Sequence, residues 1–134
     1  MVDQSKMGAT VKSALEQTDG IPDDCQVIVL EIGGNDVLGS TSINDFEVGL
    51  NRLFSRVCRA DRIVLMFELP LPPGDGGFGR VQRRLADAYG VRLIPKRILM
   101  GIIAGSNATI DSLHLSQSGH EAMASTISRI VVAK

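Results

Sequence analysis

Apolar and polar positions alternate along the chain in blocks that predict strands and helices in turn. Residues 26–32 (QVIVLEI) are nearly continuously apolar and branched, which is typical of a strand covered on both faces. Two further strands are predicted at 62–67 (RIVLMF) and 91–94 (VRLI). Helical patterns occupy the segments between them. The expected helices are 9–18, 42–60, 80–89 and 117–132, with a short helix or lid at 96–104.

Residues that start and stop helices support these boundaries. Ser42, with Asp45 three residues later, and Ser116 are suited to cap the helices that follow them, and Gly90 is suited to end one. Strands that alternate with helices predict an α/β fold with a parallel sheet and crossover helices on both of its faces. We expect one domain over residues 1–134, without an internal repeat.

Composition narrows the class of protein. The chain has 134 residues, of which 44% are hydrophobic, and a net charge of -1, so charge gives no reason to expect a nucleic acid or an anionic membrane as partner. Cys25 and Cys58 are far apart and have no neighbouring metal-ligand pattern, which predicts two buried thiols. No apolar run approaches the roughly 18 residues of a membrane span, and the N-terminus has no signal-peptide core. We expect a soluble chain as printed; a longer parent protein, periplasmic or membrane-anchored, is left open.

The most polar strand end lies at Gly33-Gly34-Asn35-Asp36. In parallel α/β sheets the ligand site lies beyond the carboxyl ends of the strands, where this stretch is expected. Glycines allow a sharp turn, the Asn35 amide can donate to a developing oxyanion, and the Asp36 carboxylate can brace the turn. An ordinary turn uses the same residue types, so these four positions leave both interpretations open.

A second motif precedes the last predicted helix. Asp111 and His114, in the sequence DSLH, are three residues apart and would face the same side of a helical turn. Asp111 could then hold one imidazole nitrogen of His114 and leave the other facing a nucleophile, as in a hydrolase triad. A surface aspartate and a histidine at a helix entry are the alternative.

Together these residues resemble the SGNH or GDSL hydrolase family. Its third block, G-x-N-D, matches residues 33–36 and implies that Asn35 is an oxyanion-hole amide. Its fifth block, D-x-x-H, implies that Asp111 is the orienting acid and His114 the general base. Gly8 lies about where the second-block glycine of the oxyanion hole belongs. The resemblance implies a flavodoxin-like three-layer α/β/α domain that hydrolyses small acyl esters or thioesters without a metal or other cofactor.

The sequence departs from this family in its first block. It contains no G-D-S, so no nucleophilic serine is identified, and Ser40, Ser42 and Ser112 are poorly suited to replace it. We therefore expect a domain truncated at its N-terminus, without the first strand and its crossover helix. That loss would expose the sheet edge beside residues 26–32 and favour self-association.

Two alternatives remain open. The run GDGGFG (residues 74–79) matches G-x-G-x-x-G, but its distance from the preceding strand and the absence of a ribose-binding acid favour a flexible loop over a dinucleotide site. The arginines that follow, at 80, 83 and 84, suit a solvated helix face.

The alternative to an esterase is a non-catalytic α/β remnant that binds a ligand or a partner subunit.

Overall fold

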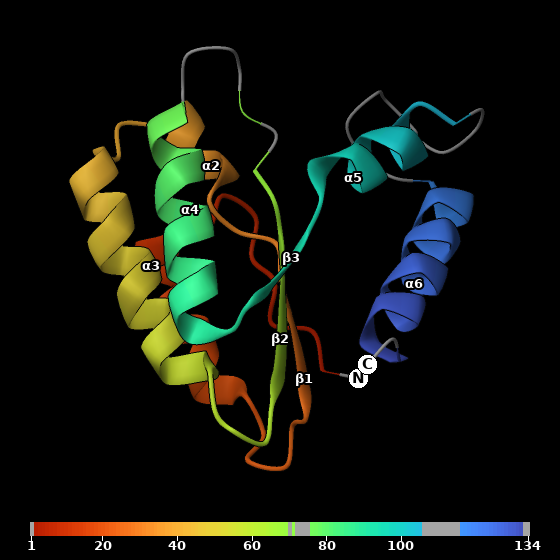
Figure 1. Cartoon of the computed structure of the whole chain (residues 1–134), viewed down its shortest axis with the longest axis horizontal. Coiled ribbons are helices and arrows are strands. Elements are labelled where there is room, and N and C mark those ends of the chain that lie inside the picture. The colour runs from red at the N-terminus through yellow and green to blue at the C-terminus, as the bar shows by residue number, and fades with distance from the viewer. Residues whose placement is uncertain (1, 70, 72–75, 106–115, 133–134) are drawn as a thin grey trace. The chain divides into compact units, whose positions relative to one another are not determined.

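The computed structural model describes residues 2–69, 71, 76–105 and 116–132 (Figure 1). The chain divides into two compact units, Met1–Ile94 and Pro95–Lys134. The N-terminal unit contains the sheet and the GGND motif, and the described residues of the C-terminal unit form two helices.

The described residues of the N-terminal unit form a sheet of three parallel strands in the order β1-β2-β3. They are β1 (Val27–Leu30), β2 (Ile63–Phe67) and β3 (Arg92–Ile94); β1 is three residues shorter than predicted, and β2 and β3 are one residue shorter each. Val27 pairs with Ile63, and Leu65 pairs with Arg92. The predicted α/β class and parallel sheet are thereby confirmed.

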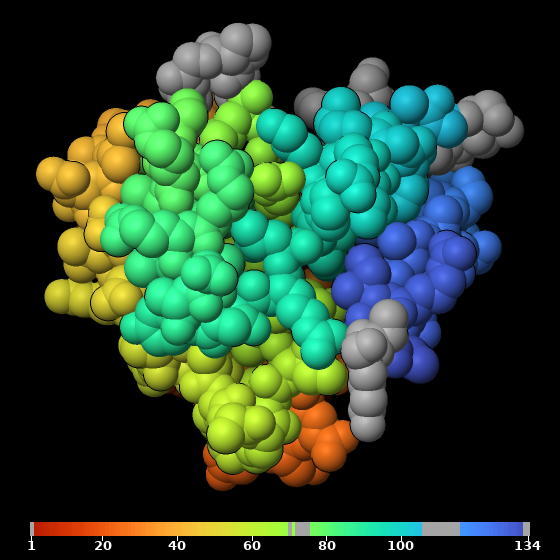
Figure 2. All heavy atoms as spheres, viewed as in Figure 1, coloured from red at the N-terminus to blue at the C-terminus, as the bar shows by residue number. Residues whose placement is uncertain are grey.

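Helices α1 (Val11–Gln17), α3 (Ile43–Val57) and α4 (Gly76–Tyr89) build the core with one face of the sheet. A short 3-10 turn, Thr18–Gly20, follows α1. Figure 1 shows α3 and α4 side by side, and Figure 2 shows their side chains, in yellow and green, abutting at the surface. The buried core residues are Val11, Ala14, Ile28, Phe46, Leu50, Leu53, Phe54, Val57, Val64, Met66, Leu69, Phe78, Val81, Leu85, Ala86 and Val91.

The helix boundaries agree with the capping residues, with one exception. Ser42 Oγ accepts the backbone N–H of Asp45 at 3.0 Å, as predicted, and Gly90 follows α4 with a φ of 69°. Helix α4, however, begins at Gly76 rather than near residue 80. Its first turn is anchored by Phe78, whose buried ring packs edge-to-face against Phe46 with ring centroids 5.1 Å apart. The flexible-loop interpretation of residues 76–79 was therefore wrong, because this aromatic contact outweighs the low helix propensity of glycine.

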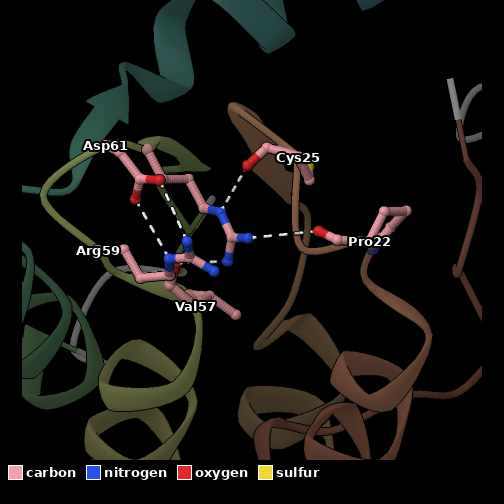
Figure 3. Close-up of polar contacts among 6 residues, drawn as sticks. Pro22, Cys25, Val57, Arg59 and Asp61 are labelled. Carbon is pink, nitrogen blue, oxygen red and sulfur yellow. Dashed lines mark hydrogen bonds and ion pairs between the residues drawn. The ribbon is translucent and has the colours of Figure 1, made fainter.

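Arg62 makes side-chain hydrogen bonds to the backbone near the amino end of the sheet. Its Nε donates to the backbone oxygen of Cys25 at 2.8 Å, and its Nη1 donates to that of Val57, at the end of α3, at 3.2 Å (Figure 3). One guanidinium thus joins the chain entering β1 to the carbonyl end of α3, where a positive charge is favourable. Cys25 and Cys58 are free and half-buried, and burial raises the pKa of Cys58, with the charge of Arg62 opposing it.

The C-terminal unit consists, in its described part, of α5 (Lys96–Ile103) and α6 (Gln117–Val132), which contact each other. Ser116 Oγ accepts the N–H of Gly119 at 3.2 Å, which confirms the predicted cap of the last helix. Among the described residues, every helix is too short or too polar to cross a membrane.

Candidate active site

Gly33 turns the chain from β1 into a short helix, α2 (Gly34–Leu38). Its φ of 103° lies in the left-handed region, and its oxygen accepts the N–H of Val37 at 3.1 Å to close the first turn. A Cβ at Gly33 would lie 3.1 Å from side-chain atoms of both Leu69 and Phe46, whereas one at Gly34 would meet nothing within 4 Å. Backbone conformation and crowding both require glycine at 33, but neither does at 34. Asn35 and Asp36 thus lie in a short helix, where the sequence predicted a sharp turn.

The Asn35 side chain lies beside the segment that contains Gly8. Its Nδ2 donates to the backbone oxygen of Ala9 at 2.9 Å, across 26 residues of sequence. Gly8 directly precedes Ala9, has a φ of 75° and is exposed. The fold therefore brings together the two residues predicted to form an oxyanion hole. An amide nitrogen carries two N–H groups, and Ala9 accepts only one of them.

The Asp36 carboxylate is tied to the same segment. Asp36 is only 1% exposed, and its Oδ2 accepts the N–H of Val11 at 3.0 Å. Val11 is the first residue of α1, so the carboxylate sits at the positive end of that helix. Burial raises the pKa of Asp36, while the Val11 N–H and the Thr41 hydroxyl oppose the rise. The sequence predicted that Asp36 braces its own turn; the bond that the structure shows is to the start of α1.

Gln82 on α4 is a buried polar residue that the sequence interpretation missed. It is fully buried, its Oε1 accepts the N–H of Leu69 at 3.1 Å, and its Nε2 donates to the oxygen of Phe67 at 2.9 Å. These bonds hold the chain where it leaves β2. The available signal was a polar residue on the apolar face of α4, next to Val81 and three residues before Leu85.

The predicted acid and base are outside the part of the chain that the structure describes. Asp111 and His114, together with Ser112, fall within residues 106–115. Their proposed roles therefore stay predictions. Of the other serines near the motifs, Ser40 is exposed, and Ser42 is engaged as a helix cap whose hydroxyl also donates to Asp45 Oδ2 at 2.7 Å.

A cleft of about 430 Å³ lies on the Asp36 side of α2, between α1 and α3. Its polar lining includes Lys12, Asp36, Thr41 and Arg52, so charges of both signs face it. Within the described ranges, no group of three or more His, Cys, Asp or Glu side chains could hold a metal ion.

Comparison with solved structures shows that the fold of this chain is similar to that of esterases. The chain superposes on the psychrotrophic esterase EstA from Pseudoalteromonas sp. with a TM-score of 0.73 and 18% identity, covering 92% of this chain and 74% of that one. For AlinE4, an SGNH-hydrolase family esterase, the TM-score is 0.64 and the identity is 23%, and the match covers 92% of this chain and 70% of AlinE4. A family 3 carbohydrate esterase from Clostridium thermocellum matches with a TM-score of 0.59 and 23% identity, over 91% of this chain and 64% of that one.

The sequence itself gives no comparable match: no protein-family model and no curated protein matches it. The likeness therefore concerns the fold, and it agrees with the resemblance that the G-x-N-D and D-x-x-H motifs indicate. The chain has the α/β fold of the SGNH-hydrolase esterases.

Proposed function

We propose that this chain carries the oxyanion-binding and acid-base part of a serine ester hydrolase that acts on small acyl esters or thioesters. The observation that supports this most directly is the bond from Asn35 Nδ2 to the oxygen of Ala9. It brings the Asn35 amide next to Gly8, on a fold shared with solved esterases. Two backbone or amide N–H donors beside each other are what a tetrahedral acyl intermediate requires.

The proposed chemistry follows the serine-histidine-aspartate scheme. A serine hydroxyl attacks the acyl carbonyl while His114 takes its proton and Asp111 holds the imidazole. Negative charge develops on the carbonyl oxygen, which receives the second N–H of Asn35 and the backbone N–H of Gly8. His114 then returns the proton to the leaving alcohol or thiol, and water releases the acyl group from the serine by the reverse path.

The serine is proposed to come from a strand that adds beside β1. In the sheet formed by the described residues, β1 has β2 as its neighbour on one side only. Residues Val27 and Val29 are 37% and 42% exposed, although strands in parallel sheets are normally covered on both faces. A strand ending in Gly-Asp-Ser would place its serine at the carboxyl edge, where α2 begins.

The test is hydrolysis of an aryl acetate by this chain together with a segment that forms such a strand. We expect turnover only when both parts are present and the serine is intact. His114→Ala should then lower the rate by several orders of magnitude, because the serine loses its base. Turnover that survives His114→Ala would contradict the role of His114.

A non-catalytic binding role is the second candidate. It is favoured by the absence of G-D-S from the sequence and by the engagement of Ser42 as a helix cap. In that case the ester would bind at Asn35 and Gly8 without turnover. Binding of an aryl acetate with no hydrolysis, even after the serine-bearing strand is added, would favour this function.

A further inference from the structure

We infer that Gln82 is a positioning residue for Asn35, which it reaches through Leu69 and Gly33; the catalytic meaning of this role rests on the proposed function. Gln82 lies on α4 and Asn35 on α2, and no direct bond joins them. The connection consists of one pair of hydrogen bonds, one close packing contact and the first turn of a short helix.

The first step is the pair of hydrogen bonds between the Gln82 side chain and the backbone at the end of β2. One planar amide accepts from the N–H of Leu69 at 3.1 Å and donates to the oxygen of Phe67 at 2.9 Å. Because Gln82 is fully buried, water cannot replace either bond without a cavity opening. Only a group that carries a donor and an acceptor side by side can make both bonds, which explains glutamine at this core position.

The second step is the contact of Leu69 with Gly33. Leu69 is 4% exposed, and its Cδ2 and Cδ1 would lie 3.1 and 3.4 Å from a Cβ at Gly33. Phe46 crowds the same position at 3.1 Å. The backbone of Gly33 is thus confined by two core side chains, and one of them has its own backbone fixed by Gln82. In a close-packed core a displacement of Leu69 is passed to Gly33.

The third step leads from Gly33 to the Asn35 amide. Gly33 precedes α2 and accepts from Val37 N–H at 3.1 Å, so its conformation sets the direction of that helix. Helix α2 has only five residues, and so short a helix is not stable without contacts to the rest of the fold. The direction of α2 in turn fixes where Asn35 Nδ2 meets the oxygen of Ala9.

The experiment follows the side-chain NH₂ resonances of Asn35 and the hydrogen exchange of the Val37 amide in the 15N-labelled whole chain. Gln82→Glu, measured at a pH at which the new carboxyl is ionised, removes the donor to Phe67 while keeping size and shape, and Gln82→Met removes both bonds. We expect both variants to shift the Asn35 resonances and to speed Val37 exchange. Lowering the pH should return the Gln82→Glu resonances toward those of the unmodified chain at the same pH, because a protonated carboxyl again offers a donor and an acceptor.

Leu85→Ala is the matched control, because Leu85 is a buried core residue of the same helix that makes no bond to the end of β2. It should destabilise the chain and leave the Asn35 resonances in place. The inference is overturned if Gln82→Glu shifts the Leu69 amide but not Asn35, or if Leu85→Ala shifts Asn35 equally. These resonances are read without ligand, so a failure of ester hydrolysis would overturn the proposed function and leave the positioning result intact.

Discussion

Asn35 and Ala9 are 26 residues apart in the sequence, and the side-chain amide of one donates to the backbone oxygen of the other at 2.9 Å. The neighbouring residue makes a similar bond to the same segment: the Asp36 carboxylate accepts from the backbone N–H of Val11 at 3.0 Å. Both polar side chains of the GGND motif thus hold the same segment at the start of α1. The motif joins two parts of the chain as well as turning one of them.

This bond gives the first prediction. Asn35→Ala should lower the free energy of unfolding by about 0.5–1.5 kcal/mol, the usual net contribution of one hydrogen bond. Asn44→Ala is the control, because Asn44 is an exposed residue of α3, and it should change stability by less than about 0.5 kcal/mol. Urea denaturation of both variants measures this. Equal effects would mean that the Asn35 bond contributes nothing to stability.

The two glycines of the motif should respond differently to the same substitution. Gly33→Ala introduces a Cβ 3.1 Å from Leu69 and Phe46 at a positive φ, and we expect a loss of about 2 kcal/mol or more. Gly34→Ala meets open space in the first turn of α2 and should be neutral or stabilising by up to about 1 kcal/mol. Thermal or urea unfolding distinguishes the two, and similar losses in both variants would contradict the described geometry.

The burial of Asp36 predicts a pH effect on stability. Because burial raises the folded-state pKa above its unfolded value, this group's contribution is complete below the unfolded pKa and is lost as the pH rises through the folded pKa. Asp36→Asn keeps an oxygen that can accept from Val11 and removes the buried charge. Its stability relative to the unmodified chain should therefore rise as the pH is raised from about 3 to 7.

Urea denaturation across this pH range measures the difference in the free energy of unfolding between Asp36→Asn and the unmodified chain. Asp87→Asn removes one negative charge from the exposed side of α4 and serves as the control for net charge. A difference between Asp36→Asn and the unmodified chain that stays constant with pH would show that Asp36 does not titrate in a buried setting.

The sequence predicted the elements of the sheet well, because each strand is a short run of branched apolar residues with no competing helical pattern. Helix caps such as Ser42 were also predictable, since the cap bond forms between residues three apart. The bonds from Asn35 and Asp36 to residues 9 and 11 were not, because they depend on how α1 packs. For the same reason, the role of Gln82 becomes visible only when β2 and α4 are placed together.

The open side of β1 gives a prediction about self-association. In the sheet formed by the described residues, β1 is an edge strand, whose backbone is a template for pairing with another chain, and Val27 and Val29 add exposed apolar surface. We therefore expect the protein to associate with itself as its concentration rises. Val29→Lys should reduce this association, because it places a charge on the edge. Val48→Lys, at a similarly exposed valine of α3, should not. Sedimentation velocity over a range of concentrations measures the effect, and a chain that stays monomeric throughout would contradict the prediction.

The central claim is that the Asn35 amide stabilises a developing oxyanion, and kcat for an aryl acetate tests it most directly. The measurement compares the unmodified chain with Asn35→Ala, each combined with the serine-bearing strand and corrected for its folded fraction. We predict that kcat falls by about 10²–10³-fold while KM changes little, because the lost N–H acts mainly in the transition state. An unchanged kcat in a folded Asn35→Ala variant would contradict the claim.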